Sequence, residues 1–300
     1  MAQRLFLFVQ FEFPWELGPP DGRYVLRAPG SDEPERVVVL GTLGAGTRAG
    51  PAGFARARSR PRTVPAQPVP EPSTVPVARV TIVDPVSISA ERQARAWLAD
   101  LDAERDVGAA VAVLNRVLYF HRIACADPYI HEVSPAQALV IRAGWGEGEQ
   151  VASGQWLFAH ELPAGGGKRG AGRRWPGGRR YSAALRPGER LAQLLGGKAQ
   201  PLGCEELTLR ARLDLDQGRL GHAAIELQAA FAAALPELRA EGKRELSTRL
   251  EELEQLAAGV AAQERAARAA GEEGPDEEIV RRALERLEAA LRARTAAGLG

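Results

Sequence analysis

Alternating apolar residues mark the start of the chain. From Leu5 to Phe13 every odd position is apolar, whereas the even positions turn polar at Gln10 and Glu12. A period of two puts alternate side chains on one face of a strand, so we predict a strand with one buried face. Three further strands are expected from β-branched runs bounded by turn residues, over residues 23–27, 35–40 and 77–83. Four strands before any helix predict a small, mostly antiparallel sheet.

The period becomes helical after residue 88. Ser89 is the predicted N-cap of a first helix, and Asp106 is the predicted N-cap of a longer core helix that ends before Asp127. Along the second helix, apolar residues recur at i, i+4, i+7 and i+11, namely Val107, Val111, Leu114 and Leu118. These residues are the expected centre of the core.

A capping signature follows at residues 134–137. Ser134 is a capping hydroxyl, Pro135 stands at the first helical position and Gln137 lies three residues after the cap. Residues 139–141 suit a strand equally well, but the cap favours a helix. A further helix is expected from about residue 149 to residue 162.

The rest of the chain is helical in pattern. We predict helices over residues 187–195, 205–216, 220–235, 238 to about 270, and 276 to about 296. In the fourth of these, apolar residues alternate in steps of four and three, which resembles a short coiled-coil seam: Leu246, Leu250, Leu253, Ala257 and Val260.

Two segments lack the apolar residues that a core requires. Residues 44–76 hold seven prolines and five arginines, with Glu71 as their one acid, and predict a disordered insertion. Residues 163–182 are rich in Gly and Arg and predict a linker. We therefore expect an α+β protein, predominantly α, with an N-terminal domain over residues 1–162 and an all-helical domain over residues 183–300.

One helical pair resembles a known repeat. Gln217-Gly218, Leu220, Ala223, Leu227 and Ala230 match the spacing of the turn and second helix of a tetratricopeptide unit, with Ala211 as the small residue of the first helix. Asp214 stands where an aromatic residue is usual, Pro236 comes one residue late, and no second copy follows at the repeat period. The resemblance covers about one unit and implies a helical hairpin of the kind that contacts other proteins.

Composition narrows the functional classes. Lys and Arg number 39 against 38 Asp and Glu, so a net charge of +1 excludes a strongly basic nucleic-acid coat. Arg outnumbers Lys by 36 to 3, which is typical of a high-GC bacterial genome. Cys125 and Cys204 are too few for a disulfide framework, no apolar run is long enough to span a membrane, and we expect a cytoplasmic protein.

The common signatures of catalysis are incomplete. The glycines of residues 41–46 follow a strand but precede no helical pattern, and Arg169 stands where a P-loop needs Ser or Thr. His121 lies four residues before Cys125 on one helical face, but a metal would need further ligands from His131 or His160. We therefore expect neither a metal nor a cofactor.

A basic segment remains as a candidate binding site. Aromatic side chains stack on bases and cations neutralise phosphates, so glycine-rich segments that combine the two are typical of sequence-tolerant polyanion binders. The candidate residues are Lys168, Arg169, Arg173, Arg174, Trp175, Arg179, Arg180 and Tyr181. A solvated linker is the alternative interpretation of this segment.

Three functions remain open. We favour a non-enzymatic scaffold or adaptor whose C-terminal helical hairpins bind another protein. The alternative is binding of RNA, DNA or another polyanion through the Arg-rich segments. The third is an enzyme with a scattered active site, with candidates among the polar residues near Cys125. No membrane partner is expected, and the oligomeric state is left open.

Overall fold

The computed structural model describes residues 4–43, 77–162, 187–269 and 274–298. Both the predicted insertion (44–76) and the predicted linker (163–182) lie outside these ranges. Of the described residues, 56% are helical and 20% lie in strands, which confirms an α+β protein that is predominantly α. None of the described helices has a stretch long and apolar enough to cross a membrane.

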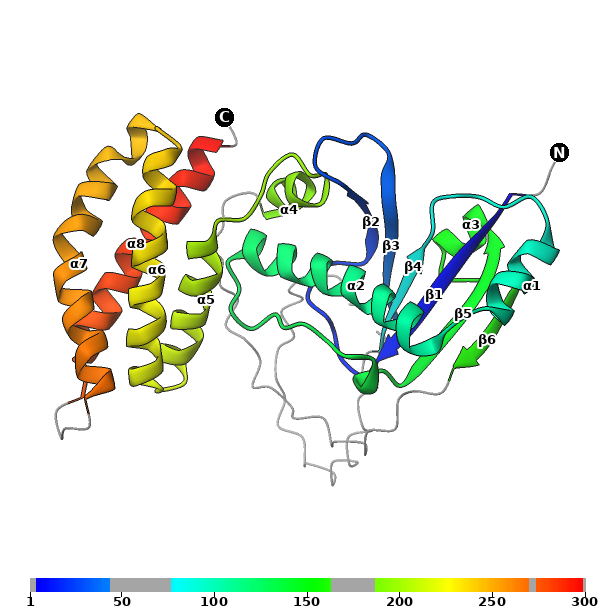
Figure 1. The fold of residues 1–300 in the computed structure, drawn as a ribbon, viewed down its shortest axis with the longest axis horizontal. Coiled ribbons are helices and arrows are strands. Elements are labelled where there is room, and N and C mark those ends of the chain that lie inside the picture. Colours follow the sequence, from blue (N-terminus) through cyan, green and yellow to red (C-terminus); the bar gives the residue numbers. More distant parts are fainter. Residues whose placement is uncertain (1–3, 44–76, 163–186, 270–273, 299–300) are drawn as a thin grey trace, which may run out of the picture.

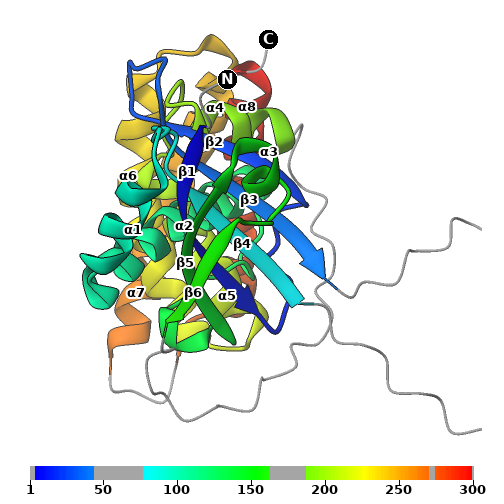
Figure 2. The ribbon, with the colours of Figure 1, turned by 90° about the vertical axis from the view of Figure 1, so that its right-hand side faces the viewer.

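Six antiparallel strands form one sheet in the order β2-β3-β4-β1-β5-β6 (Figures 1 and 2). The strands are β1 (Leu5–Phe13), β2 (Gly22–Arg27), β3 (Pro34–Leu43), β4 (Val77–Val83), β5 (Val140–Glu147) and β6 (Phe158–Leu162). The four strands predicted before the first helix are confirmed, and β1 lies at the centre between β4 and β5.

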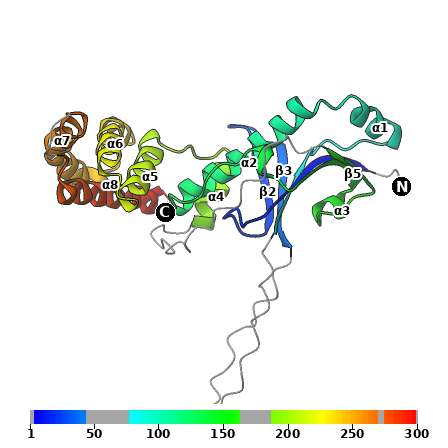
Figure 3. The same ribbon diagram turned by 90° about the horizontal axis from the view of Figure 1, so that it is seen from below.

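The alternation of β1 predicted one buried face, and this is wrong, because Phe8 and Gln10 on the other face are also buried, at 2% and 1% exposure. Three of the odd positions face the main core, as expected. Val9, Phe11 and Phe13 are buried in one cluster with the apolar face of α2 (Ala103–Cys125). Helices α1 (Glu91–Ala99) and α2 lie on this side of the sheet, and α3 (Gly148–Ala152) lies on the other (Figure 3).

Both predicted N-caps are displaced. Helix α2 begins one turn earlier than expected, because the carboxylate of Asp102 accepts a hydrogen bond from the backbone of Arg105, 2.8 Å away. Asp106 instead lies in the first turn and accepts from the backbone N–H of Asp102 at 2.8 Å. Helix α1 starts after Ala90 without a side-chain cap, so the prediction for Ser89 is wrong.

The predicted helices between residues 134 and 162 are also wrong. The capping contact forms, with the N–H of Ser134 donating to the side chain of Gln137 at 2.7 Å, but it closes only a 3-10 turn, η1 (Pro135–Gln137). Strand β5 follows and pairs with β1 over eight residues, because the inter-strand ladder and the buried Ile141 outweigh the local cap. Only five residues, those of α3, are helical in the second predicted helix, and β6 takes its last part.

Five helices follow: α4 (Pro187–Leu195), α5 (Gly203–Asp216), α6 (Leu220–Ala240), α7 (Ser247–Arg268) and α8 (Glu277–Gly298). The predicted break at Pro236 is wrong, since α6 continues through it for another turn. Leu238, 1% exposed, packs into the helical core in that last turn, and this burial offsets the hydrogen bond that proline removes. The chain then turns through Gly242 (φ 62°) and a 3-10 turn, η2 (Arg244–Leu246).

Helices α5, α6 and α7 lie side by side, and α8 crosses one face of this layer (Figures 1 and 3). The hairpin implied by the tetratricopeptide resemblance is present, because Ala211, Ala223 and Ala230 are fully buried where α5 meets α6. Within the predicted seam of α7, Leu253 and Val260 are buried. Helix α8 contributes a buried stripe to the same core: Val280, Ala283, Leu284, Leu287 and Ala290.

Helix α4 packs mainly against α2 and β2. Its leucines, Leu191, Leu194 and Leu195, belong to the same apolar cluster as Phe11 and Leu114. We call β1–β6 with α1–α4 the sheet half, and α5–α8 the helical bundle. The domain boundaries proposed from the sequence stay a prediction.

Candidate functional site

The eight residues predicted to bind a polyanion lie outside the described residues, as do the five arginines of residues 44–76. The structure does describe the strand ends from which these two segments depart. Leu43 and Val77 are paired across β3 and β4, and Leu162 pairs with Ile141 where β6 ends. Strands β3, β1 and β6 run in the same direction, so all three ends lie at the same end of the sheet. Strands β4 and β6 are three strand spacings apart, or roughly 14 Å.

A charged cluster occupies the sheet at this end, on the face opposite α2. Two arginines from neighbouring strands share one carboxylate oxygen of Glu12: Arg79 donates at 2.9 and 3.2 Å, and Arg142 donates at 2.8 Å. The three side chains are 13–25% exposed. Glu161 lies further out, 67% exposed, with its carboxylate 4.0 Å from Arg142.

A buried amide and a buried hydroxyl lie next to this cluster and are hydrogen-bonded to it. Gln10 and Thr81, each 1% exposed, are joined by a 2.9 Å hydrogen bond from the amide nitrogen of Gln10. The same nitrogen donates to the carbonyl of Gly154 at 3.3 Å, and the amide oxygen of Gln10 accepts from Arg142 at 3.4 Å. These contacts fix the turn after α3 to the sheet, with Gly154 at a φ of 72° that favours glycine.

Trp156 lies within cation–π distance of both guanidinium groups. The carbon of the Arg79 guanidinium is 5.8 Å from the centre of the indole ring, and that of Arg142 is 5.4 Å away. Phe8 packs against the tryptophan with a ring separation of 6.1 Å. The indole is half-buried.

The electrostatics of the cluster disfavour acid–base catalysis. Burial alone would raise the pKa of Glu12, but hydrogen bonds from Arg142 and Arg79 outweigh burial and hold that pKa below its usual value. A carboxylate kept ionised in this way is a poor proton donor near neutral pH. The charges of Arg79 and Arg142 are balanced by Glu12 and by the exposed Glu161, and both guanidinium groups lie over the ring of Trp156.

The paired His121 and Cys125 occupy the last turns of α2. The sulfur of Cys125 lies 3.5 Å from Nδ1 of His121. Burial, with a smaller effect of Asp127, raises the pKa of the Cys125 thiol to about 11, and burial lowers the pKa of His121. The thiol is therefore protonated at neutral pH and a weak nucleophile. In the described ranges no three His, Cys, Asp or Glu side chains are grouped to hold a metal ion.

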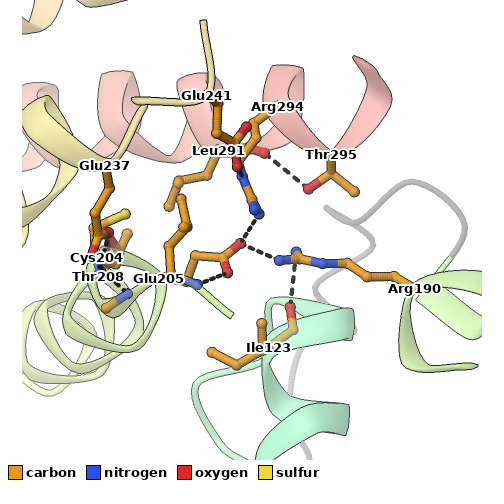
Figure 4. Close-up of polar contacts among 12 residues, drawn as sticks. Ile123, Arg190, Cys204, Glu205, Thr208, Glu237, Glu241, Leu291, Arg294 and Thr295 are labelled. Atoms are coloured by element: carbon orange, nitrogen blue, oxygen red, sulfur yellow. Dashed lines mark hydrogen bonds and ion pairs between the residues drawn. The ribbon is translucent and has the colours of Figure 1, made fainter. Parts of the chain in front are cut away.

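A second charged cluster joins the sheet half to the helical bundle (Figure 4). Glu205, at the start of α5 with 5% of its side chain exposed, accepts hydrogen bonds from Arg190 of α4 and from Arg294 of α8, the latter at 3.3 Å. Its second oxygen accepts from the backbone of Leu202 at 2.9 Å. Arg294 also donates to Glu241 at 2.6 Å. One buried carboxylate thus connects three helices.

Two further polar contacts cross the same boundary. Arg122 at the end of α2 is 2.9 Å from Glu206 of α5, and the hydroxyl of Tyr129 donates to Asp216 at 3.2 Å. Hydrogen bonds and ion pairs therefore connect the two halves, together with the apolar contact of Leu209 of α5, which belongs to the core cluster of the sheet half.

Sequence reasoning missed the cluster of Glu12, Arg79, Arg142 and Trp156, although each strand carried a signal. The even positions of β1 turn polar at Gln10 and Glu12, and polar Arg79 and Thr81 interrupt β4 at alternate positions. The missing information was the register, which places Glu12 beside Arg79 and Gln10 beside Arg142.

Comparison of the chain with models of protein families, with curated proteins and with solved structures finds no match.

Proposed function

We propose that the protein is a non-enzymatic adaptor that holds a helical segment of a partner protein on the outer surface of α6. The observation that carries this proposal is a stripe of small residues that α6 leaves exposed. Ala229, Ala232, Pro236 and Ala240 recur at steps of three and four, so they share one face of the helix. The opposite face is buried at Ala223, Leu227 and Ala230.

Small side chains let two helix backbones approach each other closely. Helix α6 lies between α5 and α7 in the layer, so its exposed stripe is flanked by a helix on each side. The partner would pack along this stripe, as α5 packs on the alanines of the buried side of α6. The contacts of Glu205 and Glu206 hold this surface at a fixed place relative to the sheet half.

The test is affinity capture from a native lysate, using the full chain and the double variant A229R/A232R. Arginine has a helix propensity close to that of alanine, so exposed positions of α6 should tolerate it. The matched control is A258R, which changes an exposed alanine of α7 in the same way. We expect nuclease-resistant partners with the wild type and the control but not with the double variant. Partners that bind all three proteins equally would contradict the proposal.

The second candidate function is binding of a polyanion through the two Arg-rich segments. It is favoured by their attachment at a common end of the sheet, at Leu43, Val77 and Leu162. Residues 44–76 and 163–182 carry eleven Lys and Arg against one acid. This is a local excess of positive charge that the nearly neutral chain as a whole does not show.

This candidate predicts a binding constant that falls steeply with salt concentration. A fluorescent single-stranded oligonucleotide would be titrated with the full chain, and with a variant in which the six cations from Lys168 to Arg180 are serine. We expect weaker binding and a shallower salt dependence for the variant. Equal binding by both proteins would contradict a role for these cations.

Both candidates include a cytoplasmic location, which is supported by the two free cysteines, Cys125 and Cys204.

A further inference from the structure

We propose that β6 pairs antiparallel with β6 of a second copy of this chain, so that two sheets join into one across a two-fold axis at His160. Strand β6 ends the sheet and is paired with β5 on one side only. It lies at the end of the molecule away from the helical bundle (Figures 1 and 2). This surface is separate from that of α6, so the inference does not rest on the adaptor function.

A strand at the edge of a sheet has backbone groups that point away from its neighbour. Within the described part of the chain, no backbone hydrogen bond reaches residues 158–162 apart from those of the ladder with β5. The N–H and C=O groups on the outer side of β6 are those that another strand uses for pairing. The occupant that complements them is therefore an extended strand.

The two edges of the sheet differ in their protection. At the other edge, β2 contacts α4 and carries Arg23 and Arg27, and both a covering helix and edge charges discourage pairing with another chain. Strand β6 contains no Pro, Lys or Arg, and none of the described helices makes comparable contact with it. The edge that is open to pairing is therefore β6.

Apolar side chains are exposed where β6 begins. Leu157 is 48% exposed and Phe158 is 40% exposed, although most large apolar side chains of the described residues are buried. The ring of Phe158 stacks on that of Trp145, with centroids 4.6 Å apart, so it is held in place beside the edge. Association of a second strand would cover part of this apolar surface, which favours pairing.

The polarity of β6 is symmetric about its middle residue, and this symmetry identifies a second copy as the occupant. Phe158 and Leu162 are the apolar ends, and with His160 they lie on one face of the strand. When His160 lies opposite the partner's His160, Phe158 lies opposite the partner's Leu162 at both ends of the pair. Glu161 lies opposite the partner's Ala159, so the two carboxylates are not directly opposed. A two-fold axis thus satisfies both ends at once.

The contact is small, so the dimer is reversible. Five paired residues on each side are far fewer than the roughly 20–30 of a stable interface. We therefore expect a dissociation constant on the order of 100 μM, with exchange between monomer and dimer.

Disulfide cross-linking of the full chain tests the register. In H160C the two introduced thiols would face each other, with Cα atoms about 4.5–5.5 Å apart, a separation that permits a disulfide. In A159C or E161C alone, each thiol is two residues out of register with its own copy, so we expect little cross-linking, whereas a mixture of the two variants should cross-link. The matched control is H222C, on the exposed side of α6, and the wild type reports on the two native cysteines.

Sedimentation equilibrium measures the same association without a cross-link, from about 5 to about 500 μM protein. His160 is exposed, so lysine is tolerated there, but H160K places two ammonium groups opposite each other. We expect roughly twofold to fivefold weaker dimerisation for H160K and no change for the control H222K. An equimolar mixture of H160K and H160E should dimerise more tightly than either variant alone, a gain that misfolding would not produce.

Three outcomes would overturn the inference. The first is a wild-type chain that stays monomeric at the highest concentration, with no more cross-linking of H160C than of H222C. The second is cross-linking of A159C or E161C alone at the rate of H160C, or a dimer that H160K leaves unchanged, because either would place the contact elsewhere. The third is protection of the β6 amides from hydrogen exchange that does not rise with protein concentration, which would indicate that the same chain covers this edge.

Discussion

Removing the charge of Glu205 should weaken the join between the sheet half and the helical bundle. In E205Q the side chain keeps its volume but loses the negative charge that balances Arg190 and Arg294. Its single amide oxygen cannot accept from these two arginines and, on the other side, from the backbone N–H of Leu202. Breaking a buried ion pair by removing one partner costs about 3–5 kcal/mol. Arg294 retains Glu241, and Arg190 retains the carbonyl of Ile123 at 3.3 Å. We therefore expect a loss near the lower limit, about 3 kcal/mol in the free energy of unfolding.

Urea denaturation followed by circular dichroism measures this loss. The matched control is E251Q, which changes an exposed glutamate on α7 and should alter stability by less than about 0.5 kcal/mol. Hydrogen exchange gives a local measurement, because amides of α4 and of the first turn of α5 should lose protection before those of the sheet. A loss below about 1 kcal/mol in E205Q, with exchange in α4 unchanged, would refute the stabilising role assigned to this cluster.

Three further predictions concern the sheet half. A Cβ at Gly144 would lie 2.1 Å from the carbonyl oxygen of Phe158, so G144A should cost about 3 kcal/mol in urea denaturation, whereas G41A, with open space around it, should cost less than about 1. Cys125 should react slowly with iodoacetamide at pH 7 and about tenfold faster per pH unit up to about pH 11, and fast reaction of the folded protein at pH 7 would contradict its burial. The pKa of Glu12 is lowered, so the stability that its ionised form contributes is present above the usual glutamate pKa and is lost as the pH falls through the lowered pKa. The difference in the free energy of unfolding between wild type and E12Q should therefore shrink over this acid range. A constant difference would contradict this explanation.

The sequence predicted a helix or strand where the pattern that indicates it lies within that helix or strand. The alternation of β1 and the i, i+4, i+7 spacing of α2 each indicate a buried face within one segment, and both elements are present, although α2 begins one turn early and β1 is buried on its second face too. The prediction for residues 140–147 was wrong because β5 forms by pairing with β1 and β6, and the pattern of its own residues does not show this pairing. Its capping residues and glycines suggest an interrupted helix, but Gly144 and Gly146 are needed where β6 and the turn after α3 approach the strand closely.

For the candidate sites, too, the sequence revealed local features but not those that depend on how distant segments pair. Sequence composition identified the two Arg-rich segments, because charge is visible in any stretch of the chain. The arrangement of Arg79, Arg142 and Trp156 around Glu12 depends on strand order and register, which bring together residues 12 and 142. No local pattern encodes that pairing. The helical bundle was easier to predict, since the steps of three and four that bury Ala223 and Leu227 are local.

The pairing of Leu43 with Val77 makes the intervening residues removable in principle. Partners across a ladder lie about 5 Å apart, so a short hairpin turn could connect β3 to β4 directly. The 33 residues of 44–76 close the same gap at an entropic cost only about 2 kcal/mol above that of a four-residue turn. The sheet therefore constrains neither the length nor the composition of this stretch. The sheet itself tolerates substitutions, insertions and deletions there, so a new binding property can evolve in this stretch while the fold is preserved.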